Sequence, residues 1–322
     1  MYQEFYRLHA MPFQLTPDSQ FFFESREHKR AIAHLLYGLS QQEGFVVITG
    51  EIGAGKTMLI EHLWSQLDAQ NFLGVRISTT QVSGDDLLRM IANGFGLAAT
   101  GFDKSALLRR LHEFFESARA TGKRCLLVID EVQNLSITAL EELRMLSNIT
   151  VERRAPFQCL LLGQPQFRQV LTDPRLEQVQ QRVLASCHLG PLNNIDTREY
   201  VLHRLRTAGW VGDPSFEEAA LSAIYRHSQG IPRKINILCS RVLLAGYLDD
   251  THDVTELMID EVAGELRRDL AAGNEGSVKH AAETETMDID ERLRSIEKTV
   301  DRHNRAIKRA LEITARLIEI RT

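Results

Sequence analysis

Eight consecutive residues of this chain have the composition of a phosphate-binding loop. Residues 50–57 read Gly-Glu-Ile-Gly-Ala-Gly-Lys-Thr, which is G-x-x-x-x-G-K-T without departure. Glycines let the backbone curl so that successive N–H groups point at one anion, and the following helix N-terminus adds partial positive charge. We expect Lys56 to reach the β- and γ-phosphates and the Thr57 hydroxyl to hold Mg²⁺. The predicted nucleotide-binding residues are Gly50, Glu51, Ile52, Gly53, Ala54, Gly55, Lys56, Thr57 and Met58.

Two adjacent carboxylates supply a second part of the predicted site. Asp130 and Glu131 directly follow the aliphatic run Leu126–Ile129, which is typical of a buried strand. A carboxylate at such a strand end can hold Mg²⁺, directly or through water, so Asp130 joins Thr57 as a predicted magnesium ligand. Glu131 is then placed to take a proton from the attacking water. The alternative is a surface turn whose acids cap a helix near residue 136.

Three further polar residues are candidates for contacts with the nucleotide. Gln164 directly follows a predicted strand, at the same sheet edge as the loop, where it could touch the γ-phosphate or the attacking water. Arg182 immediately precedes another strand. Arg233 stands at the start of a helix in the segment 230–236, from which it could swing onto the nucleotide. Each residue also has a structural alternative. Gln164 could be a turn residue before Pro165, Arg182 an ordinary solvated arginine, and Arg233 an arginine on a helix surface.

The elements that must position these residues alternate along the chain. Apolar runs predict strands at 45–49, 72–77, 124–131, 157–162 and 183–189. Helical patterns lie between them, at 26–43, 58–67, 84–95, 104–119 and 136–148, with Ser83 and Asp103 as expected N-caps. Strands that alternate with helices predict an α/β fold, a parallel sheet with helices on both faces.

The length of 322 residues exceeds the usual size of one domain, and the composition changes along the chain. We expect an aromatic lead segment at 1–25, extended and packed on another part, and a nucleotide-binding α/β domain at 26–191. A small helical domain at 192–270 follows, with Asp196 and Ser215 as expected caps of its first two helices. Residues 271–290 read as a flexible acidic linker. Residues 291–322 predict an amphipathic helix, whose first half is compatible with a coiled coil.

Composition narrows the classes of protein and site. The net charge of −5 does not indicate a nucleic-acid binder. The four cysteines form no C-x-x-C pair, and no histidine pair has metal-binding spacing on a helix, so we expect reduced thiols and no metal site made of side chains alone. We find no signal peptide and no run of 18 apolar residues, and therefore expect a cytoplasmic protein with no transmembrane segment.

Several motifs together resemble one family over residues 1 to about 266. The matching segments are Phe5–Leu8, Pro12–Asp18, Gly38–Phe45, the phosphate loop, Asp130–Leu135, Leu162–Pro165, Gln181–Val183 and Gly230–Asn236. On these the chain resembles the AAA+ ATPases related to general secretion pathway protein A. Within that group it looks most like the secretion ATPases found with exosortase/PEP-CTERM exopolysaccharide loci, with the pilus-biogenesis relatives close behind.

The resemblance implies a P-loop NTPase (AAA+) fold with a helical lid domain, and hydrolysis of ATP to ADP and phosphate. It gives Gln164 the sensor-1 position, Arg182 the trans-acting arginine finger and Arg233 the sensor-2 position. It also implies a nucleotide-dependent homo-oligomer, for which a hexameric ring is one form. The sequence shows neither the transmembrane helix nor the peptidoglycan-binding domain of general secretion pathway protein A. We therefore expect action through a membrane-associated export or polysaccharide assembly partner, with attachment to the inner membrane through that partner.

Three functions stay open at this point. The first is an ATP-driven motor or switch for a secretion, exopolysaccharide or pilus assembly system. The second is a DNA-binding AAA+ ATPase of the transposon target-selection type, because residues 291–322 hold nine Lys/Arg against five Asp/Glu. A solvated helix face explains such a mixture equally well. The third is a nucleotide-binding scaffold with very slow turnover, against which Glu131 argues.

Overall fold

The computed structural model describes residues 2–41, 44–68, 70–78, 82–149, 155 and 157–274. The predicted helix at 291–322 and most of the predicted linker lie outside the described residues. The chain divides into two compact units. One unit contains Leu15–Asp196 together with Gln229–Lys234 and is called the sheet unit below. The other contains residues up to Gln14, Thr197–Ser228 and the chain from Ile235 onward, and is called the helical unit.

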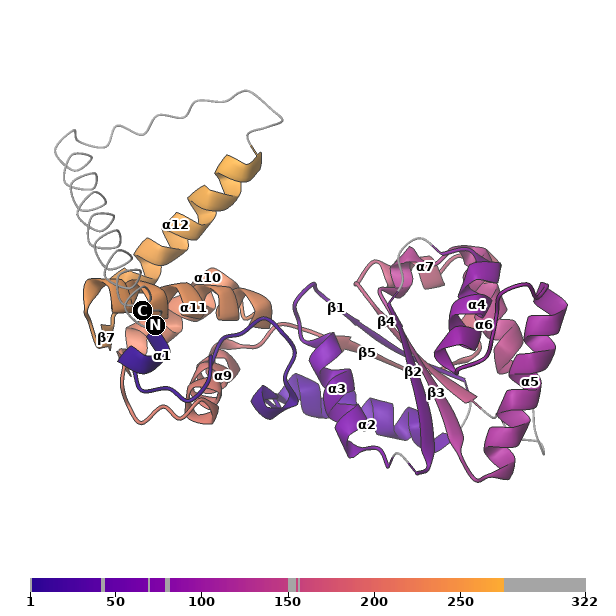
Figure 1. Cartoon of the computed structure of the whole chain (residues 1–322). Coiled ribbons are helices and arrows are strands. Elements are labelled where there is room, and N and C mark those ends of the chain that lie inside the picture. The colour runs from indigo at the N-terminus through magenta and orange to yellow at the C-terminus, as the bar shows by residue number, and fades with distance from the viewer. Residues whose placement is uncertain are drawn as a thin grey trace, which may run out of the picture. The chain divides into compact units, whose positions relative to one another are not determined.

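The sheet unit is built on a parallel sheet of five strands in the order β2-β3-β4-β1-β5 (Figure 1). The strands are β1 (Phe45–Gly50), β2 (Phe72–Ser78), β3 (Arg124–Asp130), β4 (Phe157–Gly163) and β5 (Val183–Leu189). The predicted α/β fold is confirmed, and each observed strand lies within one residue of its predicted ends. The inner strand β1, which pairs with β4 and β5, carries no exposed residue, as expected for a parallel sheet that is covered on both faces.

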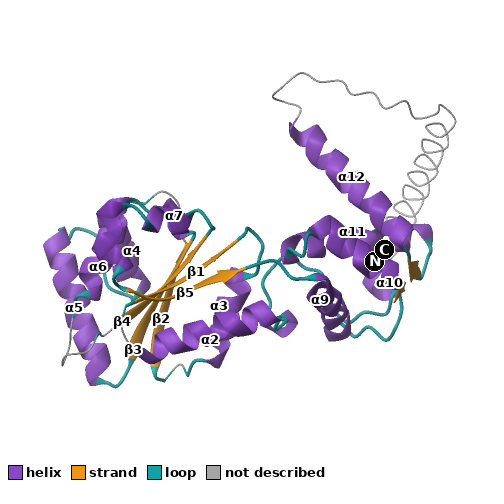
Figure 2. Ribbon diagram, turned by 180° about the vertical axis from the view of Figure 1, so that it is seen from behind, coloured by secondary structure: helices purple, strands orange, loops and turns teal. Residues whose placement is uncertain are grey.

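Helices cover both faces of this sheet (Figure 2). Alternate residues of β1 belong to two separate cores: Val46 and Ile48 pack with α2 and α3, whereas Phe45 and Val47 pack with the helices of the opposite face. The helices of the first face are α2 (Arg26–Gln41) and α3 (Lys56–Gln66). Those of the second are α4 (Gly84–Gly94), α5 (Lys104–Ala120) and α6 (Ile137–Ser147), with the short helices α7 (Phe167–Leu171) and α8 (Glu177–Gln180).

Two helices begin after the short polar residues that were predicted to cap them. Ser83 accepts a hydrogen bond from the Asp86 N–H at 3.3 Å, and Asp103 accepts one from the Ala106 N–H at 2.8 Å, so both predicted N-caps are confirmed. The four cysteines are buried and free, three of them in strands. Within the described residues, no helix is both long enough and apolar enough to cross a membrane.

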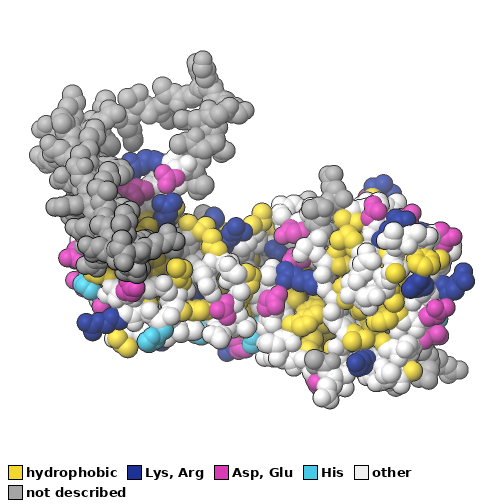
Figure 3. Space-filling model, viewed as in Figure 1, with side chains coloured by type: hydrophobic (Ala, Val, Ile, Leu, Met, Phe, Trp, Pro, Cys, Tyr) yellow, Lys and Arg dark blue, Asp and Glu magenta, His cyan; other side chains and the backbone are white. Residues whose placement is uncertain are grey.

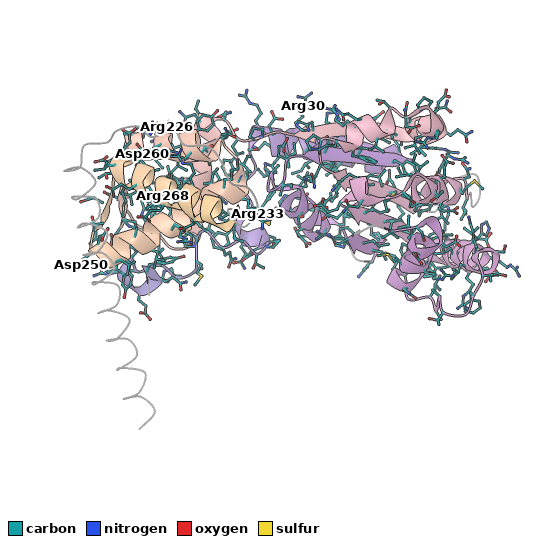
Figure 4. The ribbon with its side chains drawn as sticks, turned by 90° about the horizontal axis from the view of Figure 1, so that it is seen from above. Arg30, Arg226, Arg233, Asp250, Asp260 and Arg268 are labelled. Carbon is teal, nitrogen blue, oxygen red and sulfur yellow. The ribbon has the colours of Figure 1, made fainter. Side chains whose placement is uncertain are left out.

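The helical unit consists of four longer helices and a two-stranded parallel ribbon. Its elements are α1 (Tyr2–Phe5), α9 (Asn194–Thr207), β6 (Ser215–Phe216), α10 (Glu218–Ser228), α11 (Pro232–Asp249), β7 (Asp253–Val254) and α12 (Glu256–Asn274), of which α9 and α11 begin in the sheet unit. Arg226 on α10 and Asp260 on α12 lie side by side and form an ion pair of 2.8 Å (Figure 4).

Three expectations for the helical elements differ from the structure. Asp196 was expected to cap the first helix, but it lies within the first turn of α9, and its N–H donates to Asn193 Oδ1 at 2.8 Å. Ser215 was expected to cap a helix, but it lies in β6 opposite Asp253, and α10 begins only at Glu218. Helix α12 continues to Asn274, four residues into the segment predicted as a linker. The small residues Ala271, Ala272 and Gly273 have no helical apolar pattern, so these last residues of the helix could not be predicted.

The lead segment is bound to the helical unit by a buried arginine. Arg204 of α9 donates from Nε to the Pro12 carbonyl at 2.5 Å and from Nη1 to the Tyr200 hydroxyl at 2.8 Å. The Tyr200 hydroxyl donates in turn to Asn236 Oδ1 at 2.8 Å, and Asn236 Nδ2 reaches the Gln14 carbonyl at 3.4 Å. A buried guanidinium needs several acceptors, and backbone carbonyls supply them here. This network explains why residues up to Gln14 belong to the helical unit.

Candidate functional site

Parallel pairing in register brings the predicted site residues to one edge of the sheet. Thr49 of β1 lies opposite Gly163 of β4, and Ile129 of β3 lies opposite Leu161 of β4. The carboxyl ends of these three strands are therefore level. The phosphate loop leaves β1, Asp130 ends β3, and Gln164 follows β4 at this common edge, which is where open parallel sheets bind ligands.

Two glycines give the phosphate loop its shape. Gly53 has φ +83° and Gly55 has φ +98°, both in the left-handed region that side chains with a Cβ rarely adopt. A Cβ added at Gly55 would lie 3.0 Å from His28 Nε2, and one added at Gly53 would lie 2.4 Å from the Cβ of Arg233. Gly55 is also the N-cap of α3, and as a glycine it supplies no side-chain acceptor for the N–H groups of that first turn. N–H groups at such a helix end can bind an anion.

Lys56 is folded back onto the loop that carries it. Its side chain is buried, and Nζ donates to the Gly50 carbonyl at 2.7 Å and to the Glu51 carbonyl at 3.0 Å. Burial lowers the pKa of this ammonium group, while the negative charges of Glu131, Asp130 and Glu51 oppose that effect. Among the described residues this buried cation bonds to neutral carbonyls and forms no ion pair, so a phosphate group would stabilise it strongly.

Asp130 and Thr57 meet as expected for magnesium ligands. Thr57 Oγ1 donates to Asp130 Oδ2 over 3.4 Å, and the Asp130 side chain is only 9% exposed. Arg76 of β2 adds a contact that was not predicted, because its Nη2 lies 2.6 Å from the same Asp130 oxygen. A hydroxyl and a carboxylate oxygen are the ligands that Mg²⁺ prefers, and a cation already lies beside them. The residues present therefore fit a magnesium site.

Glu131 is held in a strained conformation by two amide side chains. Its backbone has φ 54° and ψ 41°, a left-handed conformation that costs a non-glycine residue about 1 kcal/mol or more. Glu131 Oε2 accepts from Gln133 Nε2 at 2.5 Å and from Gln164 Nε2 at 3.2 Å. Gln133 Oε1 accepts in turn from the backbone N–H of Gln164 at 2.9 Å. Strain of this kind is common where a side chain is held for a reaction.

Gly163 allows this close approach of β4 to the turn after Glu131. A Cβ at Gly163 would lie 2.8 Å from Val132 Cγ1 and 3.2 Å from Gln133 Oε1. Any larger residue would push the Gln133 side chain away from the position in which it bridges Gln164 and Glu131. The glycine before Gln164 is therefore a part of the arrangement that holds the carboxylate.

The structure does not place the Arg182 side chain with these groups. Arg182 precedes β5, and Val183 pairs with Phe45 at the amino end of β1, whereas the phosphate loop begins at Gly50. Five residues of strand separate these two ends, roughly 16 Å. Arg182 instead donates a hydrogen bond from Nη2 to Asn148 Oδ1. Its guanidinium is therefore on the opposite edge of the sheet from the phosphate loop of its own chain.

Arg233 lies at the loop through its backbone. It stands at the start of α11 (Figure 4), and its N–H donates to the Gly53 carbonyl at 3.2 Å. Residues Gln229–Lys234 belong to the sheet unit, and the Arg233 side chain is exposed. A turn at Gly230 (φ +71°) makes this possible, since a Cβ there would lie 1.9 Å from the Leu192 carbonyl oxygen.

Arg76 and Gln133 lie at the site although the sequence did not predict them there. Gln133 belongs to the segment 130–135 that supported the family resemblance, but its spacing from Glu131 gave it no role. Arg76 is one charged residue in an edge strand, where charged side chains usually face solvent. Only the pairing of β2 with β3, which places Arg76 opposite Val128, brings it near Asp130.

Comparisons with known proteins agree with this geometry. A family model described as "AAA domain" matches residues 39–171. General secretion pathway protein A of Aeromonas hydrophila is 37% identical over 270 residues, which cover 83% of this chain and 48% of that protein. The chain thus spans about half the length of this relative.

Solved structures of two other proteins share the fold. The ADP form of the Aeropyrum pernix ORC2 protein has a TM-score of 0.61 at 15% identity, with 79% of this chain and 72% of that chain covered. The Thermotoga maritima RuvB Holliday junction branch migration motor has a TM-score of 0.52 at 19% identity, with 79% and 73% covered. The chain therefore has the P-loop AAA+ fold, carries an AAA domain, and is similar over most of its length to general secretion pathway protein A.

A buried histidine lies against the phosphate loop. His28 of α2 is 5% exposed and shares a 2.7 Å hydrogen bond between its Nδ1 and Ser25 Oγ. Phe22 packs its ring against His28 and stacks on His62 of α3, which lies 3.3 Å from Glu24. Burial, with a smaller effect of His62, lowers the pKa of His28 to about 4. His28 is therefore neutral in the folded chain at pH 5 and above.

This shift predicts a pH dependence of stability. Between pH 6.5 and 4 the unfolded chain binds a proton at His28 that the folded chain does not, so stability falls as pH falls through this window. At pH 5 the loss is about 2 kcal/mol relative to neutral pH. We expect His28→Gln to reduce the decrease in the urea midpoint between pH 7 and pH 5, measured by Trp64 fluorescence in a Trp210→Phe background. His112→Gln, at an exposed histidine of α5, is the control. An unchanged pH dependence in the His28 variant would contradict this account of the loop.

Proposed function

We propose that this chain is an ATP-hydrolysing AAA+ motor or switch that acts on a membrane-associated secretion, exopolysaccharide or pilus assembly system. The observation that carries the hydrolytic part is the position of Glu131, which Gln133 and Gln164 hold at the sheet edge where the phosphate loop begins. The similarity to general secretion pathway protein A supports the link to secretion. We further propose that the target of this ATPase is an export or polysaccharide assembly system.

Binding would use groups that are already in place. The N–H groups of the glycine loop and of the first turn of α3 donate to the phosphate oxygens. Lys56 Nζ exchanges the Gly50 and Glu51 carbonyls, at 2.7 and 3.0 Å, for the β- and γ-phosphate oxygens of ATP. This exchange replaces neutral acceptors with charged ones at a buried ammonium group, which favours the nucleotide complex.

Thr57 and Asp130 would hold Mg²⁺ in this site. When bound, the ion neutralises charge on the β- and γ-phosphate oxygens. Asp130 is oriented for this role by the Glu131 N–H, which donates to its Oδ1 at 3.0 Å. The oxygen that faces Thr57 is the other one, Oδ2.

Glu131 would act as the general base. Its carboxylate accepts a proton from a water molecule while the water oxygen bonds to the γ-phosphorus, and the bond from that phosphorus to the β,γ-bridging oxygen breaks to release ADP. The Gln133 and Gln164 amides fix the direction of the carboxylate, because both donate to the same oxygen. Gln164 is also close enough to this carboxylate to contact the γ-phosphate or the attacking water.

Charge distribution favours a protein partner over DNA. The whole chain has a net charge of −5, and on the face shown in Figure 3 the basic and acidic side chains of the described residues are intermixed. Binding to nucleic acid through phosphates depends on a concentrated basic surface. We therefore retain the export or assembly partner as the proposed target.

Two substitutions separate nucleotide binding from hydrolysis. We expect Lys56→Ala to lose nucleotide binding, measured with a fluorescent ATP analogue, because the buried cation is removed. Glu131→Gln should keep binding and lower turnover by ~10²- to 10⁴-fold, since only the base is removed. Glu116→Gln, at an exposed acid of α5, is the matched control for the loss of one carboxylate. Normal turnover of Glu131→Gln would show that this carboxylate is not the base.

Self-association would complete the site, because Arg182 lies at the opposite sheet edge from its own phosphate loop. We propose that Arg182 acts on the nucleotide of a neighbouring copy, as arginine fingers supplied in trans do. Arg233 would contact the nucleotide at the loop of its own chain, where its backbone already lies.

The test mixes two inactive variants. Arg182→Ala should lose ~10³-fold or more in turnover, as other trans-acting arginines do. Mixing it with Lys56→Ala should restore part of the activity, because some sites then combine an intact Lys56 with an intact Arg182 from the neighbour. Arg175→Ala, at an exposed arginine paired with Asp173, should keep full activity by itself. If no mixing ratio rescues turnover although both variants are folded, the site is not shared.

A further inference from the structure

Arg76 reaches the site because β2 is pressed against α3. Gly74 and Arg76 are two residues apart on β2 and so face the same side of the sheet. A Cβ at Gly74 would lie 1.9 Å from Cζ2 of Trp64, so the indole of α3 lies directly over this glycine. Thr57 and Glu61 are four residues apart on α3 and share one face of the helix. Arg76 therefore extends along a helix face that carries a hydroxyl and a carboxylate.

The guanidinium binds both oxygens assigned to magnesium and one further acid. Its Nη2 lies 2.6 Å from Asp130 Oδ2 and 3.4 Å from Thr57 Oγ1. Its Nη1 lies 2.8 Å from Glu61 Oε1. The Asp130 side chain is 9% exposed, whereas Glu61 is 46% exposed. Nη2 of Arg76 thus lies at the two predicted metal ligands, while Nη1 is bonded to Glu61, which is more exposed to solvent.

We propose that Arg76 is an internal competitor of the magnesium ion, which neutralises Asp130 when the site is empty and must give up this carboxylate when a metal–nucleotide complex binds. The proposal rests on the function proposed above. A magnesium ion binds a carboxylate oxygen at roughly 2.1 Å. A guanidinium nitrogen 2.6 Å from the same Oδ2 and the ion would then be two cations at one oxygen, which repel each other.

The buried position of Asp130 gives this competition a physical reason. An unpaired carboxylate that is removed from water is strongly unfavourable, and Arg76 offsets that cost in the chain without metal. The Thr57 hydroxyl, at 3.4 Å, and the Glu131 N–H, at 3.0 Å, are neutral donors, and a neutral donor offsets less of this cost than a cation does. Metal binding therefore has to replace an existing ion pair, which lowers the apparent affinity for the ion.

Glu61 provides an ion-pair partner for the Arg76 guanidinium when this group moves away from Asp130. Because Nη1 is already bonded to Glu61, the guanidinium can turn toward that acid and still keep one ion pair. Without the Glu61 charge, Asp130 is the one carboxylate that the described contacts leave to Arg76, and competition with the metal increases. The two residues thus have opposite effects on metal affinity, which a general loss of structure would not produce.

The experiment measures the affinity of the full chain for Mn²⁺, a spectroscopic substitute for Mg²⁺, by electron paramagnetic resonance with saturating ADP. No hydrolysis is needed for this readout. Arg76→Met, which keeps the aliphatic length and removes the charge, should bind Mn²⁺ about fivefold more tightly. Glu61→Gln should bind it about fivefold more weakly, and the double variant should behave as Arg76→Met does. Arg89→Met, which removes an exposed arginine paired with Asp86 on α4, should leave the affinity unchanged.

The direction of each change in Mn²⁺ affinity tests the proposal. Weaker or unchanged Mn²⁺ binding in Arg76→Met would overturn the proposal, because it would make Arg76 a support of Asp130 or irrelevant to the ion. A shift of Glu61→Gln in the same direction as Arg76→Met would overturn it as well. Failure of the proposed function shows differently, as an unmodified chain that does not bind ADP, and the Arg76 proposal would then fall with it.

Discussion

The site depends on the level register of three parallel strands. Thr49 opposite Gly163 and Ile129 opposite Leu161 align β1, β4 and β3, so that the chain leaves all three at the same height. A shift of one residue would turn every side chain of a strand to the other face, and both faces here are covered by separate cores. The packing of helices on both sides thus fixes the register, and the register in turn assembles the phosphate loop, the acids and Gln164.

Three charged groups at this edge, Lys56, Asp130 and Glu131, have hydrogen-bond partners among the described residues. Lys56 bonds to loop carbonyls, Asp130 to Arg76, and Glu131 to the Gln133 and Gln164 amides. A buried charge without a partner would be strongly unfavourable, so these contacts stabilise the empty site. In the proposed function, a nucleotide and its metal would replace two of the three arrangements, at Lys56 and at Asp130. Glu131 can keep its amide contacts, and its strained backbone indicates that the surrounding structure holds it there.

Much of this arrangement could be predicted from the sequence, because its causes are local. The phosphate loop is a continuous motif, and the aliphatic runs of β1, β3 and β4 mark buried parallel strands, which place Asp130 and Gln164 at strand ends. The acid pair was placed correctly at the end of β3, beside Thr57. The caps at Ser83 and Asp103 also depend on neighbours in the sequence.

The remaining features depend on contacts between distant segments. The role of Arg76 follows from the pairing of β2 with β3 and from the Trp64 ring over Gly74, neither of which leaves a mark in the sequence around residue 76. Ser215 is of a residue type that often caps helices, but it pairs with Asp253, which is distant in the sequence. The backbone contact of Arg233 with Gly53 likewise requires the turn at Gly230. In each case a tertiary contact determined the outcome over the local preference.

We propose that the residues at this edge of the sheet hydrolyse ATP with a metal ion held at Asp130. The most direct measurement is the release of phosphate from ATP by the full chain, in Mg²⁺ and in excess EDTA, compared with an Asp130→Asn variant of matched stability. The account predicts steady phosphate release in Mg²⁺, and its loss both in EDTA and in the variant. Phosphate release by Asp130→Asn at the rate of the unmodified chain, or no release by the unmodified chain at any protein concentration, would contradict it.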